Sequence, residues 1–591
     1  PLIYKISLNS NPTSTTGTIE PQSEKKAAKK TNPKKNKKSK PTGATPFSKA
    51  GIQNNRFSAA FDTGKWGSQG IARITFVFED SNTTAKGFLV HPNGSRVAAS
   101  LTRMKPVQPQ SSSTQQQPNP VAGNPPPPKQ ATFPINFPLG AHGRQANPKM
   151  ERVLIQNVTI WTCSDQGVIP NGSVLFEQGK ITAVGAEITV QNPKNLVTLD
   201  GKGMHLTPGI IDCHSHMASD GGINESGQAI TAEVRIGDFI NCNDINIYRQ
   251  LAGGVTTSNI LHGSANPIGG QNQVIKLRWG MNDEEMKFAA APQGIKFALG
   301  ENVKRSRTRD STRYPKTRMG VEQIFMDEFR AARGYQQAWK KWQQTRTGMP
   351  PRRDLELDAI VEILNQKRWI HCHSYRQDEI LALIRLLDGF NIQIGTFQHI
   401  LEGYKVADAM KRHGAMGSAF SDWWAYKFEV YDAIPYAGAL MHNAGVVVSF
   451  NSDDRELARH LNHEAAKAVK YGGIPPHEAL QFVTLNPAKQ LRIDQYVGSI
   501  EIGKHADIVL WNGDPLSTMS RCEKTWVDGR RMFDRDNDLK QRGVYETMKQ
   551  KLIQKILTSN EKMNSLPHGR QPKPEEMWPQ WDEFCKCKGK K

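Results

Sequence analysis

The segment PGIIDCHSH, residues 208–216, places two histidines, one residue apart, at the end of an apolar run. A short apolar run of this kind is consistent with a buried β-strand. Side chains alternate between the two faces of a strand, so His214 and His216 project to the same side and can share a cation. Neutral imidazole is a common ligand of zinc and related metals. Taken alone, two histidines on a strand are more often packing or surface groups.

Three further segments repeat this pattern later in the chain. WIHCH (369–373) and FQH (397–399) bring histidines to the ends of β-like runs, and GVVVSFNSD (445–453) ends an apolar strand in a carboxylate. Barrel enzymes place their catalytic groups at the C-terminal ends of the strands. Four such coincidences in order are therefore a strong signal, whereas one is weak.

The region around these segments alternates apolar strands with amphipathic helices from residue 209 to residue 490. This alternation predicts βα units around a parallel sheet, and the length of ~280 residues suits an eight-fold barrel. Short strands with polar turns precede the region, over 151–208, and follow it, over 491–535. We therefore predict an α/β protein, a (β/α)8 TIM barrel with a small composite β-sandwich built from both flanks.

The first 150 residues differ in composition from the rest of the chain. They hold 21 Lys and Arg against 5 Asp and Glu, which leaves 56 against 51 in the remainder, so most of the net charge of +21 lies in this arm. We expect a disordered basic segment over 1–64, a small β-rich module over 65–105, and a Pro/Gln-rich linker over 106–150. The tail, 536–591, is expected to be helical and basic.

Composition excludes several classes of protein. No run of about 20 apolar residues exists, which argues against a membrane-spanning helix. Seven scattered cysteines predict a fold that does not depend on disulfides, and Cys585 and Cys587 are expected to be exposed thiols. The Gly-rich segment 263–270 lacks the pattern of a phosphate-binding P-loop. The basic arm is most simply a solvated tail, so nucleic acid is a disfavoured partner, and the cellular compartment is unknown.

These motifs together resemble the metal-dependent amidohydrolase superfamily, in its imidazolonepropionase- and prolidase-like branch. The segments GVTT (254–257), GSANPIGG (263–270), NPA (486–488) and GSIEIGKHADIV (498–509) are also similar to that family. The resemblance covers about 151–535, and it is specific for the superfamily but poor for the substrate.

The resemblance implies a role for each matching residue. His214 and His216 would hold one metal. His373 and His399 match the histidines after strands five and six, and would hold a second metal or complete the first site. Asp453 matches the aspartate of strand eight, a metal contact and the general base.

A two-metal site in this family also needs a bridging carboxylate, from a Glu or a carboxylated Lys. The segment GIKFALGEN (294–302) offers both, and we favour Glu301 over Lys296 because Glu301 sits at the predicted strand end. If neither bridges, the site holds one metal. Of the two neighbouring histidines, His373 is preferred as the ligand because it directly precedes Ser-Tyr, and His371 is assigned a supporting or packing role.

Substrate contacts are less sharply indicated. His262, Arg376 and Arg455 lie beside the ligand motifs and are candidates, with a surface role as the alternative. The segment 302–318 contains seven basic residues and one acidic residue and follows the predicted fourth strand. It could attract an anionic substrate, or it could be a solvated loop.

The predicted activity is metal-dependent hydrolysis of a non-peptide carbon–nitrogen bond in a cyclic amide or an N-acyl or dipeptide-like compound. Zinc is the expected cofactor, as one or two ions, with iron or manganese as alternatives. The expected partner is a small-molecule substrate, and a homo-oligomer remains open. Two other readings stay open: a one-metal deaminase of an amino-heterocycle, and an inactive barrel that serves a binding role.

Overall fold

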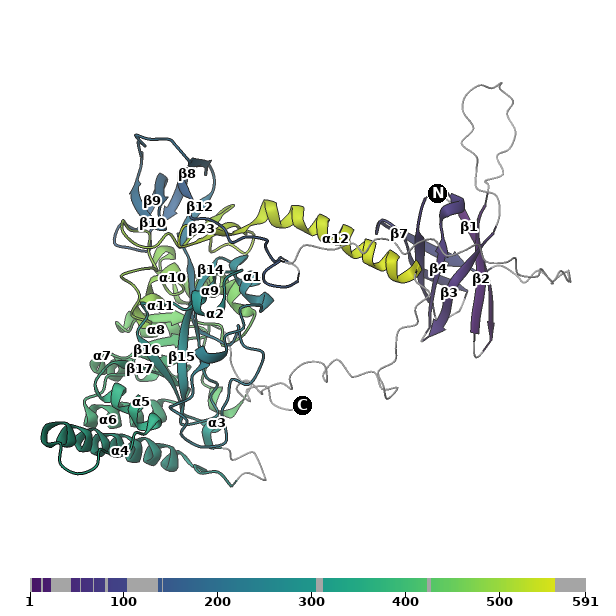
Figure 1. Cartoon of the computed structure of the whole chain (residues 1–591). Coiled ribbons are helices and arrows are strands. Elements are labelled where there is room, and N and C mark those ends of the chain that lie inside the picture. Colours follow the sequence, from purple (N-terminus) through teal and green to yellow (C-terminus); the bar gives the residue numbers. More distant parts are fainter. Residues whose placement is uncertain are drawn as a thin grey trace, which may run out of the picture. The chain divides into compact units, whose positions relative to one another are not determined.

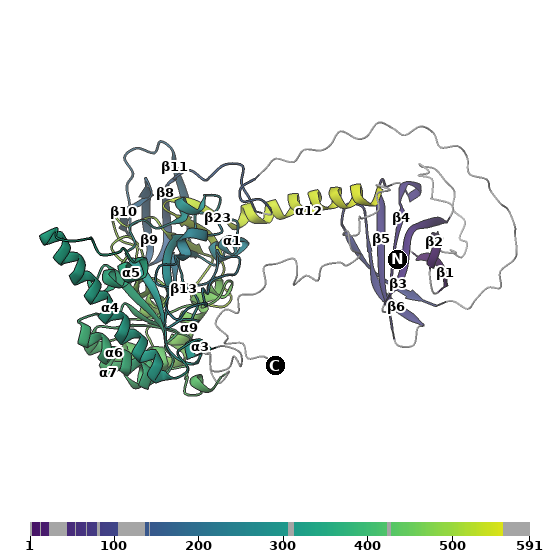
Figure 2. The ribbon, with the colours of Figure 1, turned by 60° about the horizontal axis from the view of Figure 1, so that its bottom comes forward.

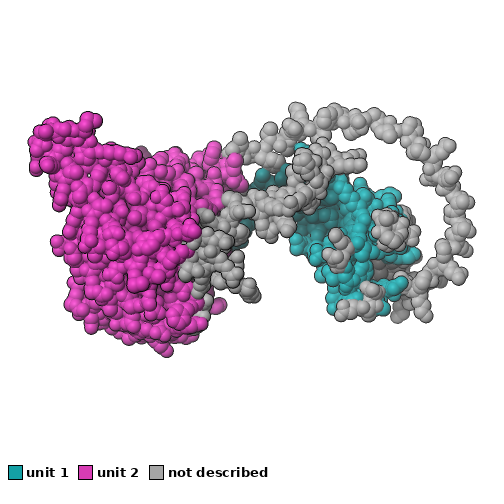
Figure 3. Space-filling model, turned by 90° about the horizontal axis from the view of Figure 1, so that it is seen from below, with its two compact units in different colours: residues 1–133, 539–571 teal, residues 134–538, 572–591 magenta. Residues whose placement is uncertain are grey.

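The computed structural model describes residues 3–11, 14–22, 44–53, 55–66, 68–79, 83–103, 136–140, 142–304, 312–421 and 427–558. The chain divides into two compact units, which Figure 3 shows in different colours. Unit 1 comprises residues 1–133 and 539–571, and unit 2 comprises residues 134–538 and 572–591.

An eight-stranded sheet forms the centre of unit 2, with its strands in chain order (Figure 1). The strands are β13 (Ile210–Ser215), β14 (Val255–Ile260), β15 (Ile268–Lys276), β16 (Gln293–Ala298), β17 (Arg368–His373), β18 (Thr396–Gln398), β19 (Met416–Ala419) and β20 (Val448–Phe450). Beyond β20, the backbone N–H of Asp453 donates to the carbonyl of His214, at the end of β13, at 3.0 Å. The sheet is therefore nearly closed, and unit 2 is an α/β domain of barrel type.

One strand of this sheet departs from the predicted parallel arrangement. β15 is antiparallel to both β14 and β16, whereas the other neighbouring strands pair in parallel. Only residues 261–267 separate β14 from β15. A parallel connection needs a crossover of about a dozen residues or more, so this short loop can only make a hairpin-like return. The prediction of an all-parallel sheet is wrong at this strand.

Helices cover the outside of the barrel-type sheet, as Figure 2 shows for α4, α5, α6 and α7. They are α1 (Ile245–Leu251), α2 (Asp283–Met286), α3 (Glu301–Lys304), α4 (Arg318–Thr345), α5 (Leu355–Leu364), α6 (Gln377–Phe390), α7 (Ala407–His413), α8 (Ala437–Asn443), α9 (Leu461–Gly472), α10 (Pro476–Gln481) and α11 (Leu485–Gln490). The apolar residues of α4 pack inward: Phe325 and Phe329 are buried, and Phe325 stacks on Phe297 of β16 at 5.3 Å between ring centroids.

A second eight-stranded sheet of unit 2 combines segments from both sides of the barrel sequence. Its strands are β8 (Arg152–Trp161), β9 (Val168–Glu177), β10 (Lys180–Gly185), β11 (Leu196–Asp200), β12 (His205–Pro208), β21 (Ile508–Trp511), β22 (Cys522–Val527) and β23 (Arg530–Asp534). β12 pairs in parallel with β8 and antiparallel with β21, so the two flanks share one sheet. The buried ammonium of Lys276, on β15, contacts Asp528 and donates to Asp507 Oδ1 at 3.0 Å, which ties this sheet to the barrel.

Residues before β8 also belong to the packed structure of unit 2. Phe137 and Arg144 exchange two backbone hydrogen bonds, and Trp279 Nε1 donates to the carbonyl of His142 at 2.8 Å. Arg530 donates to the carbonyl of Pro148 at 2.7 Å. The predicted linker over 106–150 is therefore wrong for residues 136–150 that the structure describes. The stretch has low hydropathy, and it is held by its backbone groups. Hydropathy reports on side chains only, so it gives no sign of these hydrogen bonds.

Unit 1 contains a seven-stranded antiparallel sheet whose strands follow one another in chain order. They are β1 (Ile3–Asn11), β2 (Ser14–Gln22), β3 (Thr45–Gln53), β4 (Arg56–Asp62), β5 (Ile71–Phe78), β6 (Thr84–Val90) and β7 (Arg96–Thr102). The first four strands lie in the segment predicted to be disordered, so that prediction is wrong for 3–22 and 44–62 within the described ranges. Alternating apolar residues such as Phe57 and Phe61, both fully buried, outweigh the basic composition. The basic run 24–40 lies entirely outside the described residues.

The C-terminal helix α12 (Arg535–Thr558) contributes its residues from Leu539 onward to unit 1. The side-chain amide of Gln554 accepts from the backbone N–H of Ile71 at 2.7 Å and donates to its carbonyl at 2.8 Å. The helical part of the predicted tail is confirmed to residue 558, and the rest, including Cys585 and Cys587, lies outside the described residues. None of the described helices has both the length and the apolar character needed to span a membrane.

Candidate metal centre

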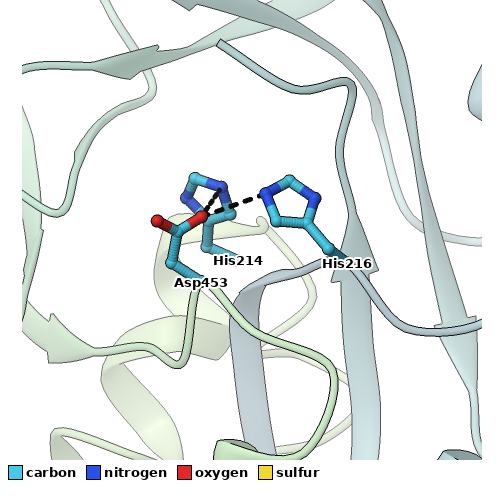
Figure 4. A group of neighbouring side chains, drawn as sticks. All are labelled: His214, His216 and Asp453. Carbon is cyan, nitrogen blue, oxygen red and sulfur yellow. Dashed lines mark hydrogen bonds and ion pairs between the residues drawn. The ribbon is translucent and has the colours of Figure 1, made fainter. Parts of the chain in front are cut away.

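Two histidines and one aspartate meet at the mouth of the barrel (Figure 4). His214 and His216 come from the end of β13, and both are almost completely buried. Asp453 Oδ1 lies 3.1 Å from His214 Nε2 and 3.0 Å from His216 Nε2. The three ligand atoms lie within 4.8 Å of one another, which is close enough to hold one cation. The same-side projection predicted for the two histidines is therefore present.

The two later histidines join this group from neighbouring strands. His373 is the last residue of β17 and His399 directly follows β18, and their ring centroids are 4.3 Å apart. The His399 ring lies 5.0 Å from that of His214, and His399 Nε2 lies 4.0 Å from Asp453 Oδ2. The structure thus brings the four imidazoles and the carboxylate into one buried cluster.

Lys296 reaches the cluster, in contrast to the expectation that favours Glu301. Its side chain is fully buried, and Nζ lies 3.1 Å from His214 Nε2. Lys296 pairs in register with His371, one layer below His373, and its four-carbon side chain spans that difference. Glu301 begins α3, beyond the end of β16, where its backbone N–H donates to Glu429 Oε2 at 2.9 Å. These contacts support Lys296 over Glu301, and which of the two would bridge stays a prediction.

Burial sets the protonation of the cluster. It lowers the pKa of His214 to about 3, with help from the positive charge of Lys296, and it holds the pKa of His373 and His399 well below the ordinary histidine value. Burial alone would raise the pKa of Asp453, but the His214 and His399 rings keep it well below its usual range. Neutral imidazoles and an ionised carboxylate are the forms that bind a cation.

The backbone is strained at two of these residues. His399 has φ of +40° and Asp453 has φ of +45°, in the left-handed region that residues other than glycine rarely adopt. Such conformations persist only where the surrounding structure enforces them, and they cluster at functional sites. In both cases the left-handed backbone lies just past the end of a strand, β18 for His399 and β20 for Asp453.

The donor set fits a divalent metal of the zinc type. Among the described residues, His399 has two buried ring nitrogens that make no hydrogen bond, although buried polar atoms are normally paired. An imidazole in this condition, beside further nitrogen donors and a carboxylate, matches the ligands that zinc and similar ions take in proteins.

Two polar residues that the motif reasoning missed hold the cluster in place. Gln398 Oε1 lies 3.2 Å from His214 Nδ1, and Gln398 Nε2 lies 3.3 Å from His371 Nδ1. Asp212 Oδ1 accepts from the backbone N–H of His214 at 3.2 Å and from that of Ser452 at 3.1 Å. Each residue lies within two positions of a histidine ligand candidate, and that adjacency is the only signal in the sequence. His371 thus contacts a residue that orients His214, in line with its predicted supporting role.

The three candidate substrate contacts all have partners within the protein. Both nitrogens of His262 are engaged by the backbone: Nε2 accepts from Glu225 N–H and Nδ1 lies beside the carbonyl of Gly263, both at 2.8 Å. Arg376 donates to Asp378 Oδ1 at 3.1 Å. The carbonyl of Arg455 accepts from the Gln250 side chain at 2.9 Å. These contacts disfavour His262 as a substrate ligand and leave the roles of the two arginines as predictions.

A buried cation lies beside the histidine cluster and was not foreseen. Lys427 Nζ is 2.5 Å from Glu429 Oε1 and 4.5 Å from the centroid of the Tyr375 ring. The Tyr375 ring in turn lies 4.6 Å from His373 and 5.0 Å from His399, centroid to centroid. Nothing in the sequence marks Lys427. Of the basic segment 302–318, residues 305–311 lie outside the described residues, and Arg313 bonds to carbonyls of neighbouring loops, including that of Ala265.

Comparison with known proteins agrees with this geometry. The sequence pattern of the family described as "Amidohydrolase family" matches residues 205–549. The amidohydrolase tasK of Hapsidospora irregularis is 33% identical over 427 residues, which are 64% of this chain and 43% of that protein. The chain thus matches less than half the length of that relative. The imidazolonepropionase of Thermoplasma volcanium is 22% identical over 64% of this chain and 94% of its own length.

A solved structure supports the same assignment. An amidohydrolase from Thermotoga maritima is 30% identical and superposes with a TM-score of 0.59, over 65% of this chain and all of that chain. Because the family pattern covers more than half of the 591 residues, this chain belongs to the amidohydrolase family.

Proposed function

We propose that this member of the amidohydrolase family is a metal-dependent hydrolase of non-peptide carbon–nitrogen bonds. The substrate class that we propose is a small cyclic amide or an N-acyl or dipeptide-like compound. The observation that carries the proposal is the meeting of four buried imidazoles at the open end of a barrel, where those of His214, His216 and His399 lie within 4.0 Å of the Asp453 carboxylate and that of His373 lies beside His399. A structural packing role would not require this set of neutral nitrogen donors around one ionised oxygen.

His214, His216 and Asp453 would hold one cation, and His373 and His399 would hold a second or complete the first site. Lys296, carboxylated on Nζ, would supply the bridging oxygens, because its side chain reaches His214 whereas Glu301 lies in α3, where its backbone N–H donates to Glu429. We propose zinc, with iron or manganese as alternatives. When bound, such an ion polarises a carbonyl group and makes water nucleophilic at neutral pH.

The residues of the chain supply the proton transfer. Asp453, held ionised, would take a proton from the attacking water and deliver it to the leaving nitrogen, which needs no covalent intermediate. Gln398 holds the His214 ring, so that the ring nitrogen facing Asp453 keeps its direction. Asp212 binds the backbone of His214 and of Ser452, the residue before Asp453, and thereby fixes the distance between the two ligands.

The surroundings of the cluster suggest where a substrate would be recognised. Lys427 adds a buried positive charge next to Tyr375, and Arg376 and Arg455 follow the strands that carry the ligand candidates. A substrate that carries a carboxylate would suit this charge better than a neutral one. This preference favours N-acyl amino acids and dipeptide-like compounds over simple cyclic amides.

The test uses the full chain reconstituted with zinc and a panel of N-acetyl amino acids, Xaa-Pro dipeptides and cyclic amides such as hydantoin. Mass spectrometry follows amide cleavage and ring opening, and a separate assay follows ammonia. We expect amide cleavage that is lost on chelation and restored by zinc. Ammonia release from amino-heterocycles without amide cleavage would support the deaminase instead. A folded chain that takes up no zinc, iron or manganese would refute the hydrolase and support a binding role.

A further inference from the structure

A cavity lies between two helices outside the barrel, apart from the histidine cluster. It has a volume of about 300 Å³ and is lined by residues of α4 and α6 and by Leu299, which follows β16. Its apolar wall includes Phe325, Leu383 and Leu386. Pockets that bind small ligands are typically of about this volume or larger, mostly apolar, with a few polar groups placed to orient the ligand. None of the predicted metal ligands lines this cavity.

One polar group in this wall lacks the partners that burial demands. The side chain of Glu379 is only 7% exposed, and neither carboxylate oxygen takes part in a hydrogen bond. It forms an ion pair with Arg318, whose Nε lies 3.9 Å from Oε1. That guanidinium is already engaged by Asp378, which it contacts through Nη1. A buried carboxylate in this position is costly unless something donates hydrogen bonds to it.

The charges around the cavity favour a positive occupant. Glu322, Asp378 and Glu379 line it, with Arg318 as the only cation among the lining residues. Asp378 has further compensation from Arg376, which donates to its Oδ1 at 3.1 Å. Burial, with a smaller contribution from nearby Glu429, raises the pKa of Glu379 to about 7, although Lys304 and Arg318 act to lower it. Glu379 is thus a buried lining carboxylate that no hydrogen bond compensates.

We propose that this cavity binds a small molecule that combines an apolar body with an ammonium group. The body would contact Phe325, Leu383 and Leu386, and the ammonium would donate hydrogen bonds to Glu379. A neutral alcohol with the same apolar body could fill the apolar part of the cavity but would place no positive charge against the Glu379 carboxylate. A carboxylic acid with the same apolar chain would add a fourth negative charge to the three lining carboxylates. The order of preference among these compounds is therefore a direct consequence of the proposal.

Isothermal titration calorimetry on the full chain tests this order with n-hexylamine, 1-hexanol and hexanoate. We expect saturable binding of n-hexylamine and binding of the other two that is at least about tenfold weaker, which corresponds to the usual strength of a hydrogen bond to a charged group. Glu379→Gln should weaken the binding of n-hexylamine by about tenfold or more. Ala382→Phe, which fills the cavity from α6 and keeps Glu379, should abolish it.

The matched control is Glu328→Gln, because Glu328 is a buried carboxylate on α4 that does not line the cavity. This variant should bind n-hexylamine as the unmodified chain does. Circular dichroism establishes that each variant is folded before titration. The proposal is overturned if the folded unmodified chain binds no n-hexylamine, if it binds 1-hexanol equally well, or if Ala382→Phe retains binding. Unchanged binding in Glu379→Gln would likewise refute the role of the carboxylate.

Discussion

The ammonium of Lys296 lies 3.1 Å from Nε2 of His214, with both side chains fully buried. A protonated lysine and a protonated histidine would repel each other. Burial and the charge of Lys296 lower the pKa of His214 and keep its ring neutral. The contact is explained if Lys296 is a metal ligand, because Lys296 and His214 would then bind the same cation.

Lys296→Met should lower the metal content of the purified chain more than Glu301→Gln does. The reason is position: Lys296 reaches the cluster from β16, whereas Glu301 lies in α3 beside Glu429. Metal per chain is measured by inductively coupled plasma mass spectrometry. If Lys296 acts as a carbamate, reconstitution with bicarbonate should increase metal uptake in the unmodified chain and not in Lys296→Met. A larger loss of metal in Glu301→Gln would instead support the carboxylate of α3.

Asp453→Asn should lower turnover by at least about 100-fold, the scale of a lost general base, while most of the metal is retained. Asparagine tolerates the left-handed backbone that Asp453 adopts, so the fold at this position should survive. Turnover is measured on whichever compound of the panel is cleaved, together with metal content. The neighbouring Asp454→Asn is the control, because the Asp454 side chain caps the backbone at Glu456 and Leu457. Equal activity in Asp453→Asn and Asp454→Asn would contradict a role as base.

Glu328→Gln should change how thermal stability depends on pH. Burial raises the pKa of Glu328 from 4.5 to about 7, with a smaller contribution from Asp354, so the folded chain binds this proton more tightly than the unfolded chain. The associated stability is fully present below pH 4.5 and is lost as the pH rises through about 7. The variant should therefore melt at a higher temperature than the unmodified chain at pH 8, and at a similar temperature at pH 4.5. A difference that is the same at both pH values would rule out this carboxyl as the cause.

A chain of residues 134–538 should be more stable than a chain of residues 151–538. The shorter chain lacks His142, whose carbonyl accepts from buried Trp279, and Pro148, whose carbonyl accepts from Arg530. Two lost hydrogen bonds correspond to about 2 kcal/mol in the free energy of unfolding. Urea denaturation followed by tryptophan fluorescence measures the difference. Identical midpoints would show that residues 134–150 are a linker after all.

Motif reasoning located most of the cluster because parallel strands end at a common edge. His214, His216, His373, His399 and Asp453 lie far apart in the sequence, but each follows an apolar run, and in a barrel such ends converge. Two properties of strands are enough to predict this convergence: their side chains alternate between two faces, and parallel strands end at the same edge.

The remaining features depend on distances that no short segment encodes. Lys296 lies one layer deeper than the ligands it reaches, so its long side chain, which the sequence does not orient, decides between it and Glu301. Lys427 lies near the cluster only because a loop returns to Tyr375. β1 to β4 were hidden by a basic and polar composition, which masked the period of two in their apolar residues.

The sheet that joins β8 and β12 to β21 has a consequence for synthesis on the ribosome. The strands from 152 to 208 emerge before the barrel, but their partners at 508–534 leave the exit tunnel only after the whole barrel has been translated. Likewise, Lys276 is synthesised long before Asp507 and Asp528, its partners in the folded domain. The strands β8 to β12 can pair with one another as they emerge, but the edge of β12 that pairs with β21 stays without its partner until the barrel has been synthesised.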